Sequence, residues 1–222
     1  MLNPTEQVPL QLWLATASPE QISGQLSLTF IPNANSSTDD PNVMFISTQA
    51  SGKNSNFTFP ANATSAQFSL ANAVVQAGTV AGTIRLTMTG VQVGGVSVTP
   101  SNSTFDVTIP RLPPTITNVR IINRTAAGFD VEITGYSTSR DITAATFTFE
   151  EAAGTNLLTV ELKPDVATQF TTYYQAPESI PVGSAFVYVQ PFNVTQGDVN
   201  AVASVTVTLT NPQGTSQPKT AN

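Results

Sequence analysis

The sequence predicts an all-β chain made of two antiparallel β-sandwiches in tandem. Three observations support this prediction. Apolar and polar residues alternate over short segments, which is the pattern of half-buried antiparallel strands. Each half of the 222 residues carries about seven such segments, spaced as in a sandwich of roughly 100 residues. A cluster of three prolines between Pro110 and Pro114 separates the two halves.

In the first half, the alternation is clearest in the segments QLSLTF, TIRLTMT and FDVTIP. The residues that it places toward the core are Leu26, Leu28, Phe30, Ile84, Leu86, Met88, Phe105, Val107 and Ile109. Mainly hydroxyl and amide side chains fill the other face, and threonine suits the solvent side of a strand. The segment LANAVVQA, residues 70–77, fits either a helix or a strand.

The second half repeats this pattern in FDVEITGY, ATFTF, LLTVEL and SVTVTLT. The core side is expected to hold Phe129, Val131, Ile133, Phe147, Phe149, Leu158, Val160, Leu162, Val205, Val207 and Leu209. Asp130 and Glu132 then face outward from their strand. Arg120 and Arg124 lie on the preceding segment, so we expect cross-strand ion pairs between the arginines and the carboxylates.

The proline cluster predicts the boundary between the two domains. Proline lacks a backbone N–H and ends strands, and it favours extended geometry in the residue before it. We therefore expect a first sandwich over residues 1–110, a short stiff linker over 111–114 and a second sandwich over 115–212. The polar residues 213–222 are expected to form a tail. The alternative is a rigid corner inside a single body of roughly 14 strands.

Composition excludes several classes of function. The chain contains no cysteine and no histidine, which rules out disulfides, thiolate nucleophiles, Ser-His-Asp triads and histidine-zinc sites. The net charge is −6 and the eight Lys and Arg residues form no cluster, so nucleic acid is not an expected partner. No apolar run approaches the roughly 20 residues that cross a bilayer. We expect no enzyme activity, no cofactor and no direct membrane insertion.

Carboxylates offer two weak candidates. Asp39 and Asp40 lie in the polar segment NANSSTDDPNV, whose oxygen atoms suit a hard cation such as calcium. The segment lacks a spaced series of acidic ligands, so a solvated loop is the alternative. Glu150 and Glu151 could serve a hydrolase as acid and base, but adjacent residues at a strand end point apart. A solvated turn is the simpler interpretation of this pair.

Aromatic residues provide the candidate ligand-binding site. Trp13 alternates with Leu10, Leu12 and Leu14, so it faces outward if the leucines face the core. Tyr173 and Tyr174 fall in a segment expected to be a loop or short turn. Exposed aromatic planes can stack on sugars or on proline-rich ligands. The alternative is that Trp13 covers an edge or a domain junction, and that the two tyrosines close one end of the second sandwich.

Several phrases together resemble a known kind of module. They are GTVAGTIRLTM, GFDVEITGYSTSRDITAATFTF, TTYYQ, VGSAFVYVQPFNVTQGD and ASVTVTLTNPQGTSQP. They are similar to repeated immunoglobulin-like or fibronectin type III-like modules in large secreted or cell-surface proteins of soil bacteria of the acidobacterial kind. The resemblance runs from about Pro9 to Pro218 and carries no active site.

The resemblance implies two immunoglobulin-like sandwiches in an exported protein, outside the cell or on its surface. The expected function is that of a non-enzymatic spacer or adhesion module. Its expected partners are neighbouring domains of the parent protein, and a surface protein or polysaccharide. The alternative function is carbohydrate binding by the exposed aromatics, with Trp13, Tyr173 and Tyr174 as the contact residues.

Overall fold

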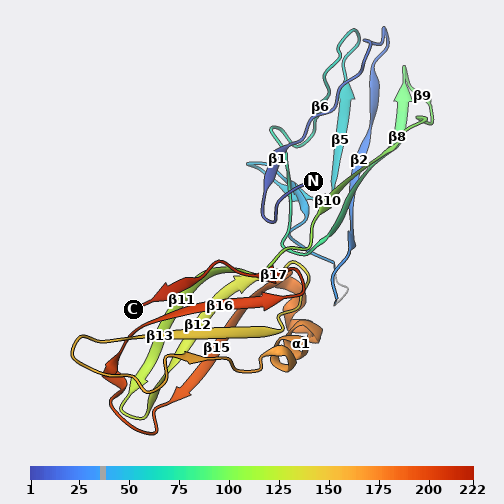
Figure 1. Ribbon diagram of the computed structural model, residues 1–222. Coiled ribbons are helices and arrows are strands. Elements are labelled where there is room, and N and C mark those ends of the chain that lie inside the picture. Colours follow the sequence, from blue (N-terminus) through green and yellow to red (C-terminus); the bar gives the residue numbers. More distant parts are fainter. Residues whose placement is uncertain (36–38) are drawn as a thin grey trace. The chain divides into compact units, whose positions relative to one another are not determined.

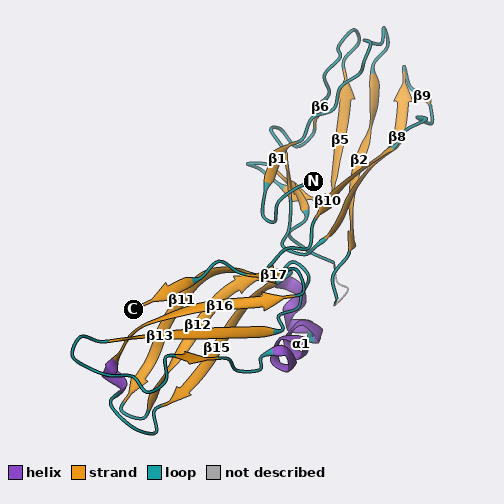
Figure 2. Cartoon of the chain, viewed as in Figure 1, coloured by secondary structure: helices purple, strands orange, loops and turns teal. Residues whose placement is uncertain are grey.

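Antiparallel strands make up nearly all of the regular structure (Figure 2). The computed structural model describes residues 1–35 and 39–222 (Figure 1). These residues form two units. The first comprises Met1–Asn33 and Asp39–Pro110, and the second comprises Arg111–Asn222 together with Ala34 and Asn35.

The first unit contains two antiparallel sheets. One has the order β1 (Gln7–Pro9), β7 (Val74–Gln76), β3 (Met44–Ile46) and β4 (Ser51–Gly52). The other has the order β10 (Thr104–Ile109), β8 (Gly82–Val93), β2 (Ile22–Pro32), β5 (Asn54–Phe59) and β6 (Gln67–Phe68), and β9 (Val96–Ser97) pairs with β8. The segment 70–77, left open between helix and strand, forms a turn that leads into strand β7.

The core of the first unit lies between these sheets. The alternation in β2 and β8 is confirmed, because Leu26, Leu28 and Ile84 are buried there. Phe105 is the exception: it is 64% exposed although Ile109 on the same strand is buried. The strands of the facing sheet have at most three residues, so that sheet does not extend over the far end of the six-residue β10. Phe105 therefore lies on the predicted face of β10, but no residue of the facing sheet covers its ring.

The second unit also contains two antiparallel sheets. One has the order β11 (Thr115–Thr125), β12 (Gly128–Tyr136) and β15 (Ala185–Asn193). The other has the order β14 (Glu161–Leu162), β13 (Ala144–Glu151), β16 (Val202–Asn211) and β17 (Gly214–Thr215), and β18 (Lys219–Ala221) pairs with β16. The helical segments are α1 (Ala167–Gln175), the 3₁₀ helix η1 (Pro177–Val182) and η2 (Val199–Ala201).

Strand pairing in the second unit is of the immunoglobulin type. Its first, second and fifth main strands form one sheet through the pairs β11–β12 and β12–β15. The pairs β13–β16 and β16–β18 in the other sheet correspond to the C–F and F–G pairs of such a sandwich. The first unit shares two central pairs, β2–β5 and β3–β7, but places β8 and β10 beside β2. The prediction of two antiparallel sandwiches is confirmed.

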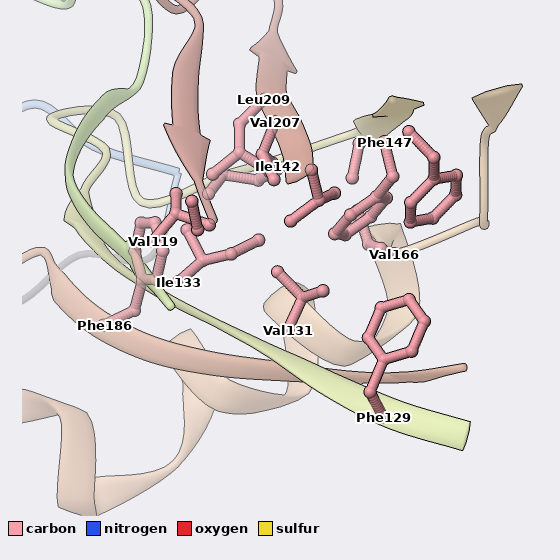
Figure 3. Close-up of a cluster of buried hydrophobic side chains, with 14 of the residues drawn as sticks. Val119, Phe129, Val131, Ile133, Ile142, Phe147, Val166, Phe186, Val207 and Leu209 are labelled. Atoms are coloured by element: carbon pink, nitrogen blue, oxygen red, sulfur yellow. The ribbon is translucent and has the colours of Figure 1, made fainter. Parts of the chain in front are cut away.

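Aliphatic and aromatic side chains fill the core of the second unit (Figure 3). In Figure 3 the rings of Phe129 and Phe186 lie on opposite sides of the cluster, with Val131 and Ile133 between them. These residues come from β12 and from β15, which pairs with it. The predicted inward faces of β12, β13 and β16 are therefore confirmed.

The segment LLTVEL departs from its prediction. Its three alternating residues, Leu158, Val160 and Leu162, are all exposed rather than buried. Only Glu161–Leu162 joins the sheet, as β14, and residues 152–160 form a connection outside it. The residues do alternate between apolar and polar. The segment pairs with β13 over only two residues, however, so the remainder is not held against the core.

The residues predicted as a linker and as a tail both belong to the second unit. Leu112 donates its N–H to Thr138 Oγ1 at 2.8 Å and accepts at its carbonyl from Asn211 Nδ2 at 2.9 Å. In the expected tail, Lys219–Ala221 pairs with Val205–Val207 in the sheet. The sequence does not predict this strand, because Lys219 and Thr220 are polar and Ala221 is its only buried residue.

Candidate functional site

Tyr174, one of the predicted ligand-binding residues, lies in the core. The segment ATQFTTYYQ forms helix α1 rather than a loop, and Phe170 and Tyr174 lie one turn apart on its buried face. The Tyr174 hydroxyl donates to the carbonyl of Ser184 at 2.8 Å. Burial is the main cause that raises the pKa of this phenol above its ordinary value. A ring in this position cannot stack on an external ligand.

Tyr173 is half-buried beside Tyr174 and also forms a hydrogen bond within the unit. Its hydroxyl donates to the carbonyl of Ala185 at 2.8 Å, and its ring centroid lies 5.1 Å from that of Tyr174. Partial burial raises the pKa of Tyr173 as well. Both tyrosines attach α1 to the start of β15, and the alternative in which they close one end of the sandwich describes their positions.

Arg140 fastens the same end of the unit. This buried residue donates to the carbonyls of Gly183 and Tyr174 and, at 2.8 Å, to the hydroxyl of Ser179. Its guanidinium carbon lies 4.9 Å from the centroid of the Tyr174 ring. One side chain thus holds the end of α1, the helix η1 and the turn that follows it. Figure 1 shows α1 at the end of the unit where β17 lies.

Trp13 is exposed, as the alternation predicts. Its relative exposure is 61%, whereas Leu10 is buried and Leu12 and Leu14 are half-buried. A single β-bridge to Ser65 holds its backbone. Trp13 is the only one of the three predicted aromatic contacts whose ring is largely open to solvent.

Asp39 and Asp40, the candidate calcium ligands, have different partners in the structure. Asp40 is fully buried, and its carboxylate accepts backbone N–H groups of Thr79 at 2.6 Å and Val80 at 2.9 Å. Asp39 is exposed and pairs with Lys53 at 2.7 Å. The two carboxylates serve different partners because adjacent residues point apart. Among the described residues no group of three acidic side chains could hold a metal ion.

The cross-strand pairs predicted on β11 and β12 form in one case out of two. Arg120 forms an ion pair with Glu132, which lies directly opposite it in the register. Asp130 instead accepts from Asn123 Nδ2 at 2.8 Å. Arg124 turns away from the sheet and donates to the carbonyl of Val202 at 3.1 Å. Ile122, and not Arg124, lies opposite Asp130 in the register, so no arginine stands across from this carboxylate.

A cavity of about 490 Å³ lies at the other end of the second unit, and we call it the aromatic groove. The lining comes from the ends of strands and from two connections. It comprises Phe129, Phe149, Asn156, Leu157, Leu158, Thr159, Leu162, Phe192, Asn193, Val194, Thr195, Gln196, Gly197, Asp198, Ala201 and Val202. Its volume falls in the range of small-ligand pockets, roughly 300–1,000 Å³.

Packed rings form the floor of the aromatic groove. The centroid of Phe192 lies 5.6 Å from that of Phe129 and 5.2 Å from that of Phe149. Phe192 is half-buried, so one part of its ring packs on the core and another part borders the groove. The Phe149 and Phe192 rings meet edge to face, the Phe129 and Phe192 rings are tilted, and such a cluster is a hydrophobic surface suited to a further aromatic group.

The walls of the groove are the β13–β14 and β15–β16 connections. The first wall holds Leu158, which is 82% exposed. Arg124 stabilises the second wall by donating hydrogen bonds to the carbonyls of Val199 and Val202. Its guanidinium carbon lies 5.6 Å from the centroid of the Phe129 ring. A backbone hydrogen bond of 2.8 Å from Ala152 to Ala201 joins the walls at their base. The groove is therefore preformed.

Two apolar residues of this groove are visible in the sequence, although their alternation predicts that they lie in the core. Leu158 and Leu162 have the spacing of core residues but lack a long enough strand to carry them inward. Glu150 and Glu151 stand near it without forming a catalytic pair: Glu150 accepts from Ser204 Oγ at 3.1 Å and Glu151 from the Leu157 N–H at 3.3 Å. The groove offers apolar contact, amide groups and one carboxylate, that of Asp198.

Comparisons with known proteins add little to the strand pairing. Neither a protein-family model nor a curated protein matches the chain. Among solved structures, the chain is similar to domains A168–A170 of titin, with 11% sequence identity and a TM-score of 0.23. The match covers 97% of this chain and 65% of the titin chain. In the described residues no helix has the length and apolar character needed to cross a membrane.

Proposed function

We propose that this chain is a non-enzymatic structural and interaction module, a spacer or adhesion element, of a larger exported bacterial protein. The observation that supports an interaction role is the aromatic groove, a preformed apolar surface with Phe129, Phe149 and Phe192 in its lining. Exposed apolar surfaces of this kind mark contacts with other molecules. The partners are neighbouring modules of the parent protein, and a surface protein or polysaccharide.

The spacer role is supported by the way the second unit is secured at the end where the chain enters it. Leu112 is hydrogen-bonded through both its N–H and its carbonyl to Thr138 and Asn211. These bonds fix the backbone of Leu112 within the second unit, so this part of the predicted linker is not free chain. The export of the parent protein is supported by the resemblance to secreted and surface modules given above.

The experiment that tests this proposal is a fractionation of the source cells with an antibody raised to the chain. We expect the epitope in the envelope or the culture medium, on a protein far larger than the 23.3 kDa of this chain. A soluble cytoplasmic protein of 23.3 kDa would overturn the exported-module proposal. A known cytoplasmic enzyme and a known envelope protein, blotted in parallel, control for leakage between fractions.

Carbohydrate binding is the second candidate function, and the exposure of Trp13 favours it. Because this is the only tryptophan in the chain, its emission reports directly on stacking by a sugar. A panel of soluble polysaccharides should quench or shift the emission, and the signal should saturate. Trp13→Ala should abolish binding measured by affinity electrophoresis. An unchanged emission across the whole panel would exclude this candidate.

A further inference from the structure

Among the exposed apolar features of the described chain, two lie at the ends of their units. One is the indole of Trp13 in the first unit, which is 61% exposed and for which no side-chain hydrogen bond is found within the described residues. The other is the aromatic groove in the second unit. A protruding aromatic side chain and an aromatic-lined groove are complementary in shape and chemistry.

The location of Trp13 within the first unit places it at a free end. Its bridge partner Ser65 precedes β6, close in sequence to the end of β5 at Phe59, and β2 begins nearby at Ile22. Pro110 follows β10, whose last residue, Ile109, pairs with Gly82 at the opposite end of the same sheet. Trp13 therefore lies at the end of the first unit that is remote from Pro110.

The aromatic groove likewise lies at a free end of its own unit. Phe129 begins β12 and Phe192 lies opposite it near the end of β15. Leu112 bonds to Thr138, which follows the other end of β12. The groove is thus at the end of the second unit remote from Leu112. Each unit carries one of the two complementary features at the end that does not lead into the other unit.

The chemistry of the groove suits an indole. The rings of Phe129, Phe149 and Phe192 can make edge-to-face contacts with it. The oxygen atoms of Asn156, Asn193 and Asp198 in the lining can accept the indole N–H. Asp198 is the only ionisable residue in the lining, so the entry of a neutral side chain removes little hydration from charges.

We propose that the aromatic groove of one molecule binds Trp13 of a second copy of this chain. The two surfaces differ, so the contact joins Trp13 of one copy to the groove of another, either in an open head-to-tail chain or reciprocally in a closed pair. This inference rests on the proposed interaction role and names a partner for the groove. The contact centres on one side chain and is small, which makes it weak between separate molecules and effective where copies are held close together.

The first test measures association of the wild-type chain over a concentration series that extends to about 1 mM, the effective concentration scale of linked modules. Sedimentation velocity should show a mass that increases with concentration. The tryptophan emission should shift to shorter wavelength over the same range, because the indole leaves water. The polysaccharide panel is run at low protein concentration, where only sugar stacking can move the emission.

Variants then locate both sides of the contact. Trp13→Ala and Leu158→Glu should each weaken self-association by about 30-fold or more, the factor typical of a lost hot spot. Both positions are exposed, so the fold should be retained. Phe105→Ser is the matched control, since Phe105 is an equally exposed aromatic residue on the first unit that the proposal does not use.

A mixture of the two variants tests whether the contact joins two different surfaces. Trp13→Ala keeps an intact groove and Leu158→Glu keeps an intact tryptophan, so an equimolar mixture should form a one-to-one complex although neither variant associates alone. The emission of Trp13 in Leu158→Glu should shift on addition of Trp13→Ala. A contact between two identical surfaces does not predict both the individual loss and the recovery in the mixture.

Three outcomes would overturn the proposal: a monomer with unchanged emission over the whole series, association unaffected by Trp13→Ala, or association that Phe105→Ser removes instead. Titration of the Trp13→Ala variant with N-acetyl-tryptophanamide separates this failure from failure of the interaction role. Amide shifts at Phe192 and Val194 without self-association would leave the groove as a binding site for another partner. Absence of both signals would remove the groove from the proposed function as well.

Discussion

The side-chain amide of Asn211 donates a 2.9 Å hydrogen bond to the carbonyl oxygen of Leu112. The same amide reaches the hydroxyls of Ser137 at 3.2 Å and Ser139 at 3.0 Å, and all three side-chain groups are buried. The point where the chain enters the second unit is therefore part of a buried polar network rather than a surface connection. Buried networks of this kind are rigid when their members are satisfied.

The first prediction concerns the N–H of Leu112. Thr138→Val keeps the side-chain volume but removes the oxygen that accepts this N–H at 2.8 Å. Hydrogen exchange of the Leu112 amide should accelerate by roughly tenfold, the equivalent of one net hydrogen bond. Thr143→Val is the control, because its hydroxyl bonds to Thr210 on the sheet. Equal exchange at Leu112 in both variants would show that the Thr138 bond does not hold this residue.

The second prediction concerns Arg140. Arg140→Met leaves the carbonyls of Gly183 and Tyr174 without their charged donor, and it removes a 2.8 Å bond to Ser179. We expect the second unit to lose about 3 kcal/mol or more of unfolding free energy, since bonds to charged groups contribute about 1.5–3 kcal/mol each. Urea denaturation followed by the circular dichroism of the tyrosines measures this loss.

Arg120→Met provides the comparison for Arg140. Arg120 lies on the surface of the same unit, with a side chain that is 60% exposed and paired with Glu132. Exposed pairs contribute about 0.2–1 kcal/mol, so this variant should remain near the wild type. A loss for Arg140→Met no larger than that for Arg120→Met would contradict the role of Arg140 in holding α1 and η1.

The third prediction concerns Asp40. Asp40→Asn retains one oxygen but loses the carboxylate that accepts the N–H groups of Thr79 and Val80. The first unit should lose about 1–3 kcal/mol in thermal or urea unfolding. Asp39→Asn should change stability by less than about 1 kcal/mol because its partner Lys53 is at the surface. If calcium raised the unfolding midpoint and Asp40→Asn removed that effect, a metal role would replace the structural one.

The fourth prediction concerns alkaline pH. Burial raises the pKa of Tyr174 in the folded chain, whereas the unfolded phenol ionises near about pH 10. The folded state then holds a proton that the unfolded state releases, so stability is retained below about pH 10 and declines above it. The decline for this one group is at most about 1.4 kcal/mol per pH unit.

Tyr174→Phe tests this alkaline effect. The variant loses the 2.8 Å bond to Ser184, so it should be less stable at neutral pH. It should also lose part of its sensitivity above pH ~10, because no buried phenol remains to ionise at this position. Urea midpoints over an alkaline pH series give both quantities. Parallel curves for the two proteins would show that Tyr174 does not control the decline.

Local alternation was sufficient for the strands whose neighbours are long. Phe129 and Val207 lie on strands of nine and ten residues that pair along their length, so the pattern and the burial agree. Leu158 and Phe105 have the same pattern, but a short strand or a short facing sheet leaves them uncovered. Strand length depends on partners that are distant in sequence, which a local pattern does not contain.

The predicted positions of the candidate residues agree or disagree with the structure for equally specific reasons. Trp13 was placed correctly, because the leucines beside it define the inner face. Tyr174 was misplaced because helix α1 is short, although Phe170 and Tyr174 at a spacing of four residues were a detectable helical signal. The role of Asp40 depends on backbone groups about 40 positions further along the chain, at Thr79 and Val80, and no local pattern could show it.

Strand β15 forms one edge of its sheet, and two of its outward valines, Val187 and Val189, are exposed. An open edge with exposed β-branched residues is a template for fibril growth. Pro191 interrupts it, because proline offers no N–H to an incoming strand. We therefore expect Pro191 to limit edge-to-edge pairing when molecules are crowded together, as the proposed self-association requires. We expect replacement of Pro191 to increase pairing between β15 edges before it changes the fold of the sandwich.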